Sequence, residues 1–214
     1  MNRKRRTYTL HKRAQAAQDT RLSIIEATRT LLAETGYPDI SLDDIAVRAG
    51  VSRQTIYVQF GSKSGVLQAV GEHIEHAALD GLIPTLLQSG NPIEALRSGL
   101  ERVVQFYEHD AQVLRNLHAQ TVYDASYATV WRDKQQEIWR NTRRLMEWLD
   151  REGCLTADWS VEEATDWFWA ASSFESYHQL VSERGWTTGQ FVGRIMQLVE
   201  KTLLGHEDGA HPQE

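Results

Sequence analysis

The 214-residue sequence predicts an all-α protein with a small N-terminal domain of three helices and a larger helical domain. Apolar residues recur at helical spacing through most of the chain, and no segment shows the sustained alternation typical of a half-buried strand. The four prolines each fall near an expected helix end or in the C-terminal tail. No apolar stretch approaches the ~18–20 residues that a membrane span needs.

The composition is that of a globular protein able to bury a sizeable core, with 41% hydrophobic residues. The single cysteine, Cys154, excludes an internal disulfide and a cysteine-based zinc site. The basic stretch Met1–Arg13 is followed by no apolar core, so it is not expected to be a secretory signal. We therefore expect a soluble, cytoplasmic protein.

Helix-capping residues mark the first helices. Gly36 supplies a stop after the first periodic apolar segment, and Ser41 and Asp44 match a capping box. Only the tripeptide Ala49–Val51 separates two short helices. The helices predicted in this part are about Asp19–Thr35, Leu42–Ala49, Ser52–Val58, and one that starts at Ser62 and runs to about Leu82.

Five or six longer helices are expected in the remainder of the chain. Asn91 is an N-cap before a proline at the first helical position, and Gly153 closes a long helix. Ser160–Glu163 and Thr187–Gln190 match capping boxes. The predicted helices run from Asn91 past Tyr107, over about Ala111–Val122, Tyr127–Arg151 and Val161–Glu183, and from Thr188 to about Leu204.

The net charge of −6 hides an uneven distribution. Residues 1–63 carry 11 basic and 6 acidic side chains, whereas the rest of the chain carries 12 basic and 23 acidic ones. A basic head on an acidic body is the asymmetry expected when only one end meets a phosphate backbone. A solvated basic tail would account for Arg3–Arg6 but not for Arg48, Arg53 and Lys63, so charge favours DNA binding weakly.

The segment from Ser41 to Lys63 has the pattern of a helix-turn-helix, two short helices joined by a tight turn that favours glycine, here Gly50. Val51 and Ile56 are the expected buried anchors of the second helix. Arginine and glutamine can make bidentate contacts with guanine and adenine edges. The residues expected to face a groove are Arg53, Gln54, Thr55 and Gln59.

Two further residues suit the DNA backbone. Tyr57 has a ring to pack and a hydroxyl that can reach a phosphate oxygen. Lys63 is at the start of the next helix, where free amides and the helix dipole already favour an anion. Together, the residues expected to contact DNA are Ser41, Arg48, Ser52, Arg53, Gln54, Thr55, Tyr57, Gln59 and Lys63.

The run from Thr35 to Lys63 resembles the DNA-binding domain of the tetracycline-repressor (TetR/AcrR) family. The resemblance implies that Ser52–Gln59 is the recognition helix and that Tyr57 and Lys63 contact phosphates. Val58 and Gln59 depart from the family, where an aromatic residue and a histidine or tyrosine are common. An ordinary three-helix bundle is the structural alternative. The matching residues are Gly36-Tyr37, Ile45-Ala46, Ala49-Gly50-Val51-Ser52, Tyr57, Phe60, Ser62-Lys63 and Leu67.

The resemblance also implies the organisation and role of the whole chain. The expected domains are the helix-turn-helix domain (residues 19–66) and a helical ligand-binding and dimerisation domain (67–204); the two terminal segments themselves predict disorder, as a basic extension (1–18) and a tail (205–214). The implied function is a sequence-specific transcriptional regulator, a repressor released from a near-palindromic operator by a small ligand. The alternatives are an activator, or an architectural DNA-binding protein without ligand control.

The basic extension has two interpretations. Arg3, Lys4, Arg5 and Arg6 can lead an arm into the minor groove of DNA. The simpler interpretation is a plain disordered tail. Deletion of residues 2–13 without a change in affinity or salt dependence would exclude the arm.

The family resemblance implies a homodimer built from the last two predicted helices. Two amphipathic helices per subunit can form such a four-helix interface. Two recognition helices can then enter successive major grooves about one turn (~34 Å) apart. The alternative is that these apolar faces close the core of the subunit. The residues expected at the interface are Trp167, Phe168, Phe174, His178, Phe191, Ile195 and Leu198.

Seven tryptophans is a high count for this length. Together with the tyrosines they suggest an aromatic-lined cavity for a small, apolar or aromatic ligand. For any single aromatic residue, a place in the core is the more common outcome. The candidate ligand-binding residues are Tyr107, His118, Tyr123, Tyr127, Trp131 and Phe174.

No catalytic, cofactor or metal site is expected. The sequence contains no recognisable nucleophile–base pair, metal cluster or phosphate loop, which argues against an enzyme. His73 and His76 are three residues apart on a helix and could share a metal, although two solvated histidines are far more common. A nucleoid protein that binds without sequence preference should have a basic body, and this body is acidic.

Overall fold

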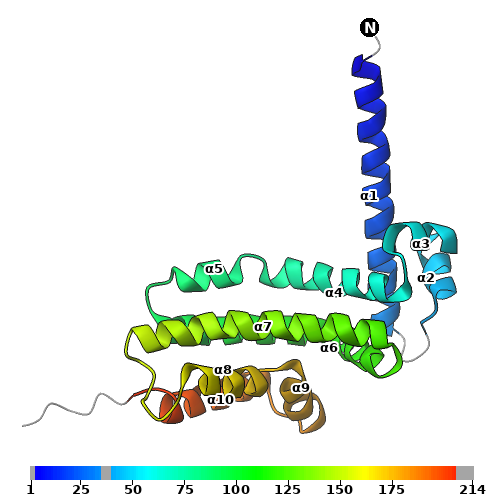
Figure 1. Ribbon diagram of the computed structural model, residues 1–214. Coiled ribbons are helices and arrows are strands. Elements are labelled where there is room, and N and C mark those ends of the chain that lie inside the picture. Colours follow the sequence, from blue (N-terminus) through cyan, green and yellow to red (C-terminus); the bar gives the residue numbers. More distant parts are fainter. Residues whose placement is uncertain (1–2, 35–39, 206–214) are drawn as a thin grey trace, which may run out of the picture. The chain divides into compact units, whose positions relative to one another are not determined.

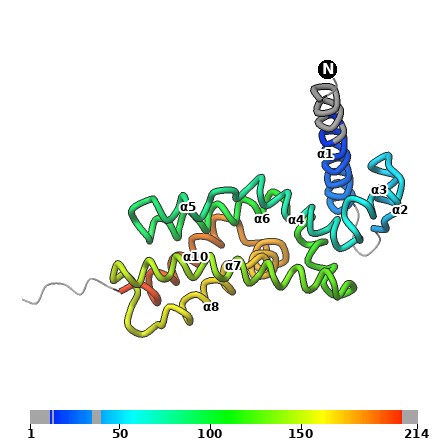
Figure 2. Tube along the Cα trace, turned by 45° about the horizontal axis from the view of Figure 1, so that its top comes forward, coloured from blue at the N-terminus to red at the C-terminus, as the bar shows by residue number. Residues whose placement is uncertain are grey.

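The computed structural model describes residues 3–34 and 40–205 of the chain, without the side chains of residues 3–11 and 13 (Figures 1 and 2). Helices make up the regular structure of these residues apart from an isolated bridge between Leu155 and Leu204, so the all-α prediction is confirmed. None of the described helices is long and apolar enough to cross a membrane. The elements are α1 (Arg3–Glu34), α2 (Leu42–Ala49), α3 (Arg53–Phe60), α4 (Lys63–Leu79), α5 (Leu82–Leu87), α6 (Pro92–Tyr123), α7 (Ala125–Arg151), α8 (Val161–Ala171), α9 (Phe174–Tyr177), the π-helix η1 (His178–Glu183) and α10 (Thr188–Thr202).

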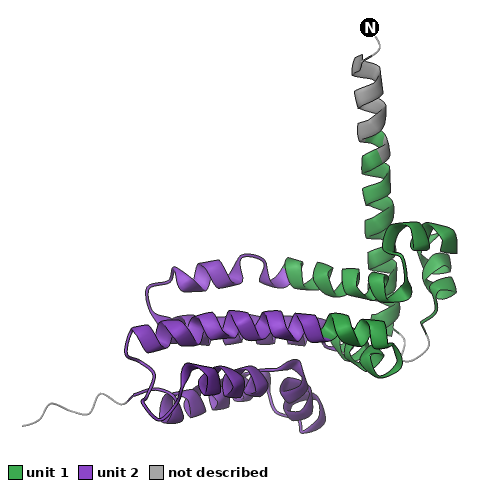
Figure 3. Cartoon of the chain, viewed as in Figure 1, with its two compact units in different colours: residues 1–77, 112–131 green, residues 78–111, 132–214 purple. Residues whose placement is uncertain are grey.

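The chain forms two compact units (Figure 3). Unit 1 comprises residues 1–77 and 112–131, and unit 2 comprises residues 78–111 and 132–214. Helices α6 and α7 continue from one unit into the other. This division does not coincide with the domain boundary expected after residue 66, because residues 112–131 bond to α1 and α4, which are far away in sequence.

Unit 1 has an apolar core to which its first four helices all contribute. The exposed fraction is zero for Ile24 of α1, Ile45 of α2, Ile56 of α3 and Leu67 of α4. Removing one such side chain from water stabilises the fold by about 1.5–3 kcal/mol. Helical spacing in the sequence therefore identified the inward faces of these helices correctly.

Helix α1 begins at Arg3, well before the predicted start at Asp19. Residues 3–18, for which the sequence predicted a disordered extension, are part of α1 in the structure. The sequence pattern missed this part because it has no apolar stripe, yet it contains Ala14, Ala16 and Ala17 and no glycine or proline. Residues 35–39, which include the expected stop at Gly36, and residues 206–214 of the expected tail lie outside the described residues.

The end of α6 is anchored to α1 inside unit 1. Asn116 Nδ2 donates to the carbonyl oxygen of Leu32 over 2.6 Å, and both residues are buried. Leu32 lies in the last turn of α1, where carbonyl groups lack partners within the helix. The amide of Asn116 therefore satisfies a buried acceptor that would otherwise be costly to leave unpaired.

Unit 2 is built around an aromatic cluster that joins distant segments. Tyr107 of α6 lies 5.4 Å from Phe174 and 5.5 Å from Tyr177, measured between ring centres. Phe191 of α10 lies 5.6 Å from Tyr177 in an edge-on arrangement. Edge-to-face pairs of this kind stabilise a core beyond their buried area.

The single helix predicted over Val161–Glu183 is interrupted. Helix α8 ends at Ala171, and Ser173 caps a new helix by accepting a hydrogen bond from the backbone amide of Ser176. The hydroxyl of Ser172 bonds instead to the carbonyl of Phe168. Consecutive serines offer the backbone these local alternatives to a continuous helix, which is the physical reason for the break.

Two other helix predictions need correction. Helix α5 was not predicted as a separate element, and it follows Gly81, whose φ of 67° suits glycine. The helices predicted from Asn91 and over about Ala111–Val122 form one element, α6, with non-helical backbone angles at Asp110. The capping boxes predicted at Ser41, Ser160 and Thr187 are all present.

Candidate nucleic-acid interface

Two short helices, α2 and α3, are joined by a three-residue turn. Gly50 ends α2 with a φ of 67°, a left-handed conformation that glycine adopts without strain. The next amide, of Val51, donates to the carbonyl of Ala46 over 3.0 Å. Ser52 then starts α3, because its hydroxyl accepts a hydrogen bond from the amide of Thr55 over 3.1 Å. This is the geometry that a helix-turn-helix requires.

Helix α3 has one buried anchor and a largely exposed opposite face. Ile56 is fully buried, whereas Arg53 and Gln54 are exposed. Among the described residues, Gln54 has no hydrogen-bonding partner for its side chain, so its amide is available to an external group. Tyr57 is 42% exposed and Val58 is 75% exposed. The exposed face therefore presents a guanidinium, a carboxamide, a phenol and an apolar side chain.

Arg53 is held by partners on both short helices. Its Nη1 atom lies 3.2 Å from Oδ2 of Asp43 on α2, and its Nη2 atom donates to the hydroxyl of Tyr57 over 3.4 Å. Both members of the ion pair are more than half exposed. An exposed pair of this kind contributes little stability, so Arg53 can exchange Asp43 for another anion at small cost.

Arg48, also predicted to contact DNA, forms an ion pair with the last residue of α1. Its Nη2 atom lies 2.7 Å from Oε2 of Glu34. The hydrogen bond from Arg48 holds the pKa of the Glu34 carboxyl below its usual value, with a smaller contribution from charge attraction. Arg48 therefore joins α2 to α1 in this structure.

Gln59, which the sequence predicted to face a groove, contacts α1 in the structure. Its Nε2 atom donates to the carbonyl of Ala17, at a long distance of 3.5 Å. From α1, Arg21 donates to the carbonyl of Gln59 over 2.9 Å and lies over the ring of Phe60. These contacts connect the end of α3 to α1.

Lys63 starts α4 and is half-buried. Burial lowers the pKa of its ammonium group, and attraction to the Asp124 carboxylate opposes this change. Asp124 is the residue between α6 and α7, and its Oδ2 atom accepts from the hydroxyl of Ser64 over 2.7 Å. The charge of Asp124, the residue after α6, thus acts on Lys63, which is a predicted phosphate contact.

The remaining predicted contacts have local roles at helix starts. The Ser41 hydroxyl bonds to Oδ2 of Asp44 over 2.6 Å and accepts from the Asp44 amide over 3.1 Å. The hydrogen bond from the Ser41 hydroxyl, followed by that from its backbone amide, keeps the pKa of Asp44 below its usual value. Thr55 is half-buried, and its hydroxyl lies 2.9 Å from that of Ser52.

The six candidate ligand-binding residues fall into both units. In unit 1 the rings of His118 and Trp131 lie 5.2 Å apart, and Tyr127 is buried, which raises the pKa of its phenol. Tyr123, in contrast, is 69% exposed. The other two, Tyr107 and Phe174, belong to the aromatic core of unit 2.

Most of the predicted dimer residues are core residues of unit 2. Four of them are buried within the chain itself: Phe168, Phe174, Phe191 and Ile195. Leu198 is 49% exposed, and Trp167 and His178 are half-buried. Only these last three present surface, because an amphipathic helix in a subunit has one face that closes its own core and another that faces outward.

The histidine pair does not form a metal cluster in the described part of the chain. His73 Nε2 lies 2.8 Å from Oε1 of Glu26 on α1, and no group of three potential ligands occurs among the described residues. His73 therefore joins α4 to α1.

Several residues of this surface were missed by the sequence analysis. They are the partners Glu34, Asp43 and Asp124, the anchor Arg21, and the exposed Val58. The pairing of Asp43 and Arg53 links two helices across a turn, and Asp124 is 60 residues from Ser64. Only Val58 carried a sequence signal, as a departure from the family pattern.

Comparison with known proteins finds relatives that match part of the chain. The family model described as bacterial regulatory proteins, tetR family, matches residues 24–70. The HTH-type transcriptional regulator AlkX of Mycobacterium tuberculosis is 38% identical over 78 residues, which cover 36% of this chain and 37% of that protein. The matched region covers less than half the length of this and the other leading curated relatives.

Solved structures share the fold over most of the chain. A protein from Rhodococcus sp. described as a TetR-family transcriptional regulator has a TM-score of 0.71 and 18% identity, with 86% of this chain and 98% of that chain covered. A transcriptional regulator from Saccharomonospora viridis, solved in complex with choline, has a TM-score of 0.68 and 18% identity over 88% of this chain and 100% of that one. At this identity the likeness concerns the fold alone.

Proposed function

Because this chain belongs to the tetR family of bacterial regulatory proteins, we propose that it is a transcriptional regulator that binds duplex DNA through α2 and α3. The observation that carries the proposal is the exposed polar face of α3, which follows a glycine turn and a buried Ile56 anchor. A two-helix unit of this shape can place its second helix in the major groove. Membership of a regulator family supports this function over an enzymatic one.

The side chains divide into two roles. Gln54, and Arg53 once it leaves Asp43, can form bidentate contacts with base edges. Tyr57, Lys63 and the caps Ser41 and Ser52 lie where hydroxyl, ammonium and helix-start amide groups suit phosphates. The remaining proposed contacts are Arg48, Thr55 and Gln59.

We propose that the regulator acts as a homodimer on a near-palindromic operator. A two-fold dimer presents two recognition helices, and these fit half-sites about one helical turn (~34 Å) apart. The outward face of α10, which includes Leu198, and the half-buried Trp167 and His178 are the surfaces proposed for the partner subunit.

A small ligand is proposed to release the protein from DNA, which would make it a repressor. The ligand must bind more tightly to the form that does not fit DNA, since only a difference in affinity shifts a population. The aromatic residues His118, Tyr123, Tyr127 and Trp131 in unit 1, and Tyr107 and Phe174 in unit 2, are the candidate contacts. The choline complex of the Saccharomonospora viridis regulator supports a small-molecule ligand in this fold.

Genome-wide footprinting of the full-length protein tests the DNA-binding proposal. Recovery of a few palindromic sites, each bound at least ~10³-fold more tightly than mixed-sequence DNA, is the expected result. A protein that binds DNA with no preferred sites would be architectural, and one that binds none would overturn the proposal.

A ligand screen on the recovered operator then tests the sign of regulation. A compound that releases the protein from the operator and raises transcription of the adjacent gene supports a repressor. Loss of transcription on deletion of the regulator would instead show an activator.

A further inference from the structure

Asp124 lies at the corner between α6 and α7, and both of its carboxylate oxygens accept hydrogen bonds within unit 1. Its Oδ1 atom accepts from the amides of Ser126 and Tyr127 over 2.9 and 3.0 Å, so it is the N-cap of α7. Its Oδ2 atom accepts from the Ser64 hydroxyl over 2.7 Å. The carboxylate is therefore fixed in position by hydrogen bonds to two helices.

This fixed carboxylate bonds to Ser64, the residue that follows Lys63 in the chain, and its negative charge and the positive charge of Lys63 attract each other. Burial alone would raise the pKa of Asp124, but the hydrogen bonds from Ser64, Tyr127 and Ser126, with the charge of Lys63, lower it overall. The carboxylate is thus ionised at neutral pH. A phosphate that approaches Lys63 meets an ammonium group whose charge is already partly offset.

We propose that Asp124 sets the DNA affinity of this surface by competing with DNA phosphates for the charge of Lys63. The proposal rests on the proposed function, in which Lys63 contacts the DNA backbone. Asp124 touches no DNA in this account and acts through Lys63, so it is a positioning and charge-balancing residue. It also makes the α6–α7 corner part of the DNA-binding machinery, although the corner is far from α3 in sequence.

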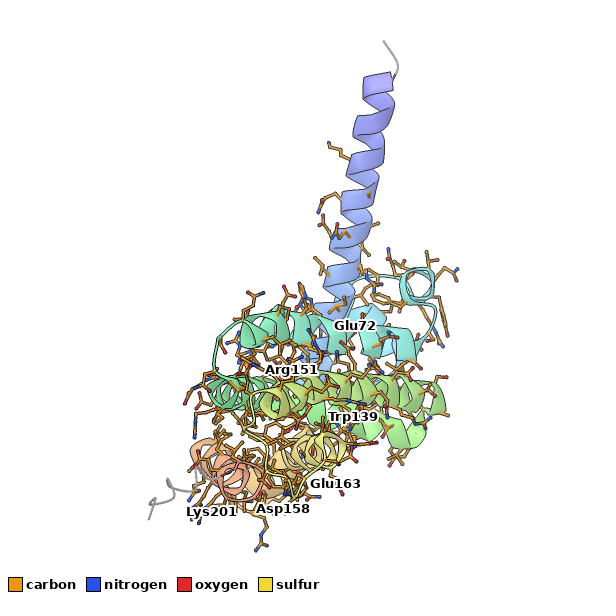
Figure 4. All side chains as sticks on the ribbon, turned by 60° about the vertical axis from the view of Figure 1, so that its left-hand side comes forward. Glu72, Trp139, Arg151, Asp158, Glu163 and Lys201 are labelled. Carbon is orange, nitrogen blue, oxygen red and sulfur yellow. The ribbon has the colours of Figure 1, made fainter. Side chains whose placement is uncertain are left out.

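Two substitutions separate the charge of Asp124 from its structural bonds. Asp124→Asn removes the charge and keeps Oδ1 as the acceptor for the α7 amides, while its Nδ2 group can donate to the Ser64 hydroxyl oxygen; asparagine also caps helices as well as aspartate does. Ser64→Ala removes the hydrogen bond and keeps the charge. The control is Glu72→Gln, which changes net charge equally at an exposed residue of α4 (labelled in Figure 4), about 13 Å along the helix from Lys63 and beyond the ~8 Å screening length.

The probe is a fluorescent mixed-sequence DNA duplex of about 30 base pairs, titrated with full-length protein at several salt concentrations, since phosphate contacts do not depend on base sequence. Asp124→Asn should bind roughly three- to tenfold more tightly at low salt. The slope of the logarithm of the binding constant against the logarithm of the salt concentration should be steeper by up to about 0.9 for each Lys63 that contacts a phosphate. Ser64→Ala and Glu72→Gln should each stay within about twofold of the parent protein.

A double-variant comparison links the gain to Lys63. In the Lys63→Gln background, Asp124→Asn should give no further gain in affinity and no change of slope. A gain that persists without Lys63 would overturn the proposal, as would an Asp124→Asn protein that binds with unchanged or weaker affinity. Weaker binding by Ser64→Ala together with an unchanged Asp124→Asn protein would show a purely structural role.

Failure of the proposed function has a different signature. A parent protein that does not bind the duplex even at low salt would overturn the DNA-binding proposal, and the inference would fall with it. A parent protein that binds, with an Asp124→Asn variant that binds no better, would overturn the inference alone.

Discussion

The guanidinium of Arg21 lies 4.2 Å from the centre of the Phe60 ring. From the same position, its Nη1 atom donates to the carbonyl of Gln59 over 2.9 Å. That carbonyl is in the last turn of α3, where helix carbonyls lack internal partners. The Arg21 side chain of α1 thus donates to a carbonyl at the end of the proposed recognition helix and packs over its last aromatic ring.

Arg21→Ala should lower the free energy of unfolding by about 1–2 kcal/mol, because a charged hydrogen bond and a cation–π contact are both lost. The free energy of unfolding of Arg21→Lys should lie between those of Arg21→Ala and the parent protein, since lysine keeps the charge but lacks the planar guanidinium. Urea denaturation measures both. Equal stability of all three proteins would show that this contact does not hold α3 in place.

Substitution of Gln54 should change the base preference of the protein, whereas substitution of Tyr57 should change its affinity for all sites. Gln54→Ala should relax preference at one base position of the operator and cost about 1–3 kcal/mol there, because a bidentate base contact is lost. Tyr57→Phe should weaken all sites alike, since its hydroxyl is proposed to meet a phosphate. Binding to a library of single-base operator variants measures this, and a uniform loss with Gln54→Ala would contradict its proposed position against a base.

The Ser41–Asp44 capping box should make α2 sensitive to acid. Because the pKa of Asp44 is lowered in the folded protein, its charged form stabilises the fold above its unfolded pKa. That contribution is lost as pH falls through the folded value, below about pH 4. Thermal unfolding between about pH 6 and pH 3 should therefore show a smaller decrease for Asp44→Asn than for the parent protein. Parallel curves would show that this carboxylate contributes nothing.

Substitutions of Phe191 and Leu198, both on α10, distinguish the effect of core packing from that of dimer formation. Phe191 is fully buried, so Phe191→Ala should cost about 3–5 kcal/mol of stability. Leu198 is 49% exposed, so Leu198→Glu should leave subunit stability within about 0.5 kcal/mol and weaken self-association. Analytical ultracentrifugation with denaturation distinguishes the two effects. A Leu198→Glu protein with unchanged self-association would exclude this face of α10 as the interface.

The dimer residues show where sequence reasoning reached its limit. The apolar periodicity of α8 and α10 correctly placed Phe168, Phe191 and Ile195 on the apolar faces of their helices. This periodicity does not distinguish the core of a subunit from an interface between subunits. Both are apolar surfaces removed from water, and both favour the same residue types. Only the packing in three dimensions assigns these residues to the core.

What the sequence determined by itself was local. Gly50, the capping boxes at Ser41, Ser160 and Thr187, and the periodic apolar residues act through neighbours a few positions away, so their pattern alone predicted the helices and the turn. The partners of the predicted DNA contacts were decided by tertiary structure: Glu34 for Arg48, Asp43 for Arg53 and Asp124 for Lys63. Charge acts through space over several ångströms, and no sequence pattern records which distant carboxylate the fold brings beside a given cation.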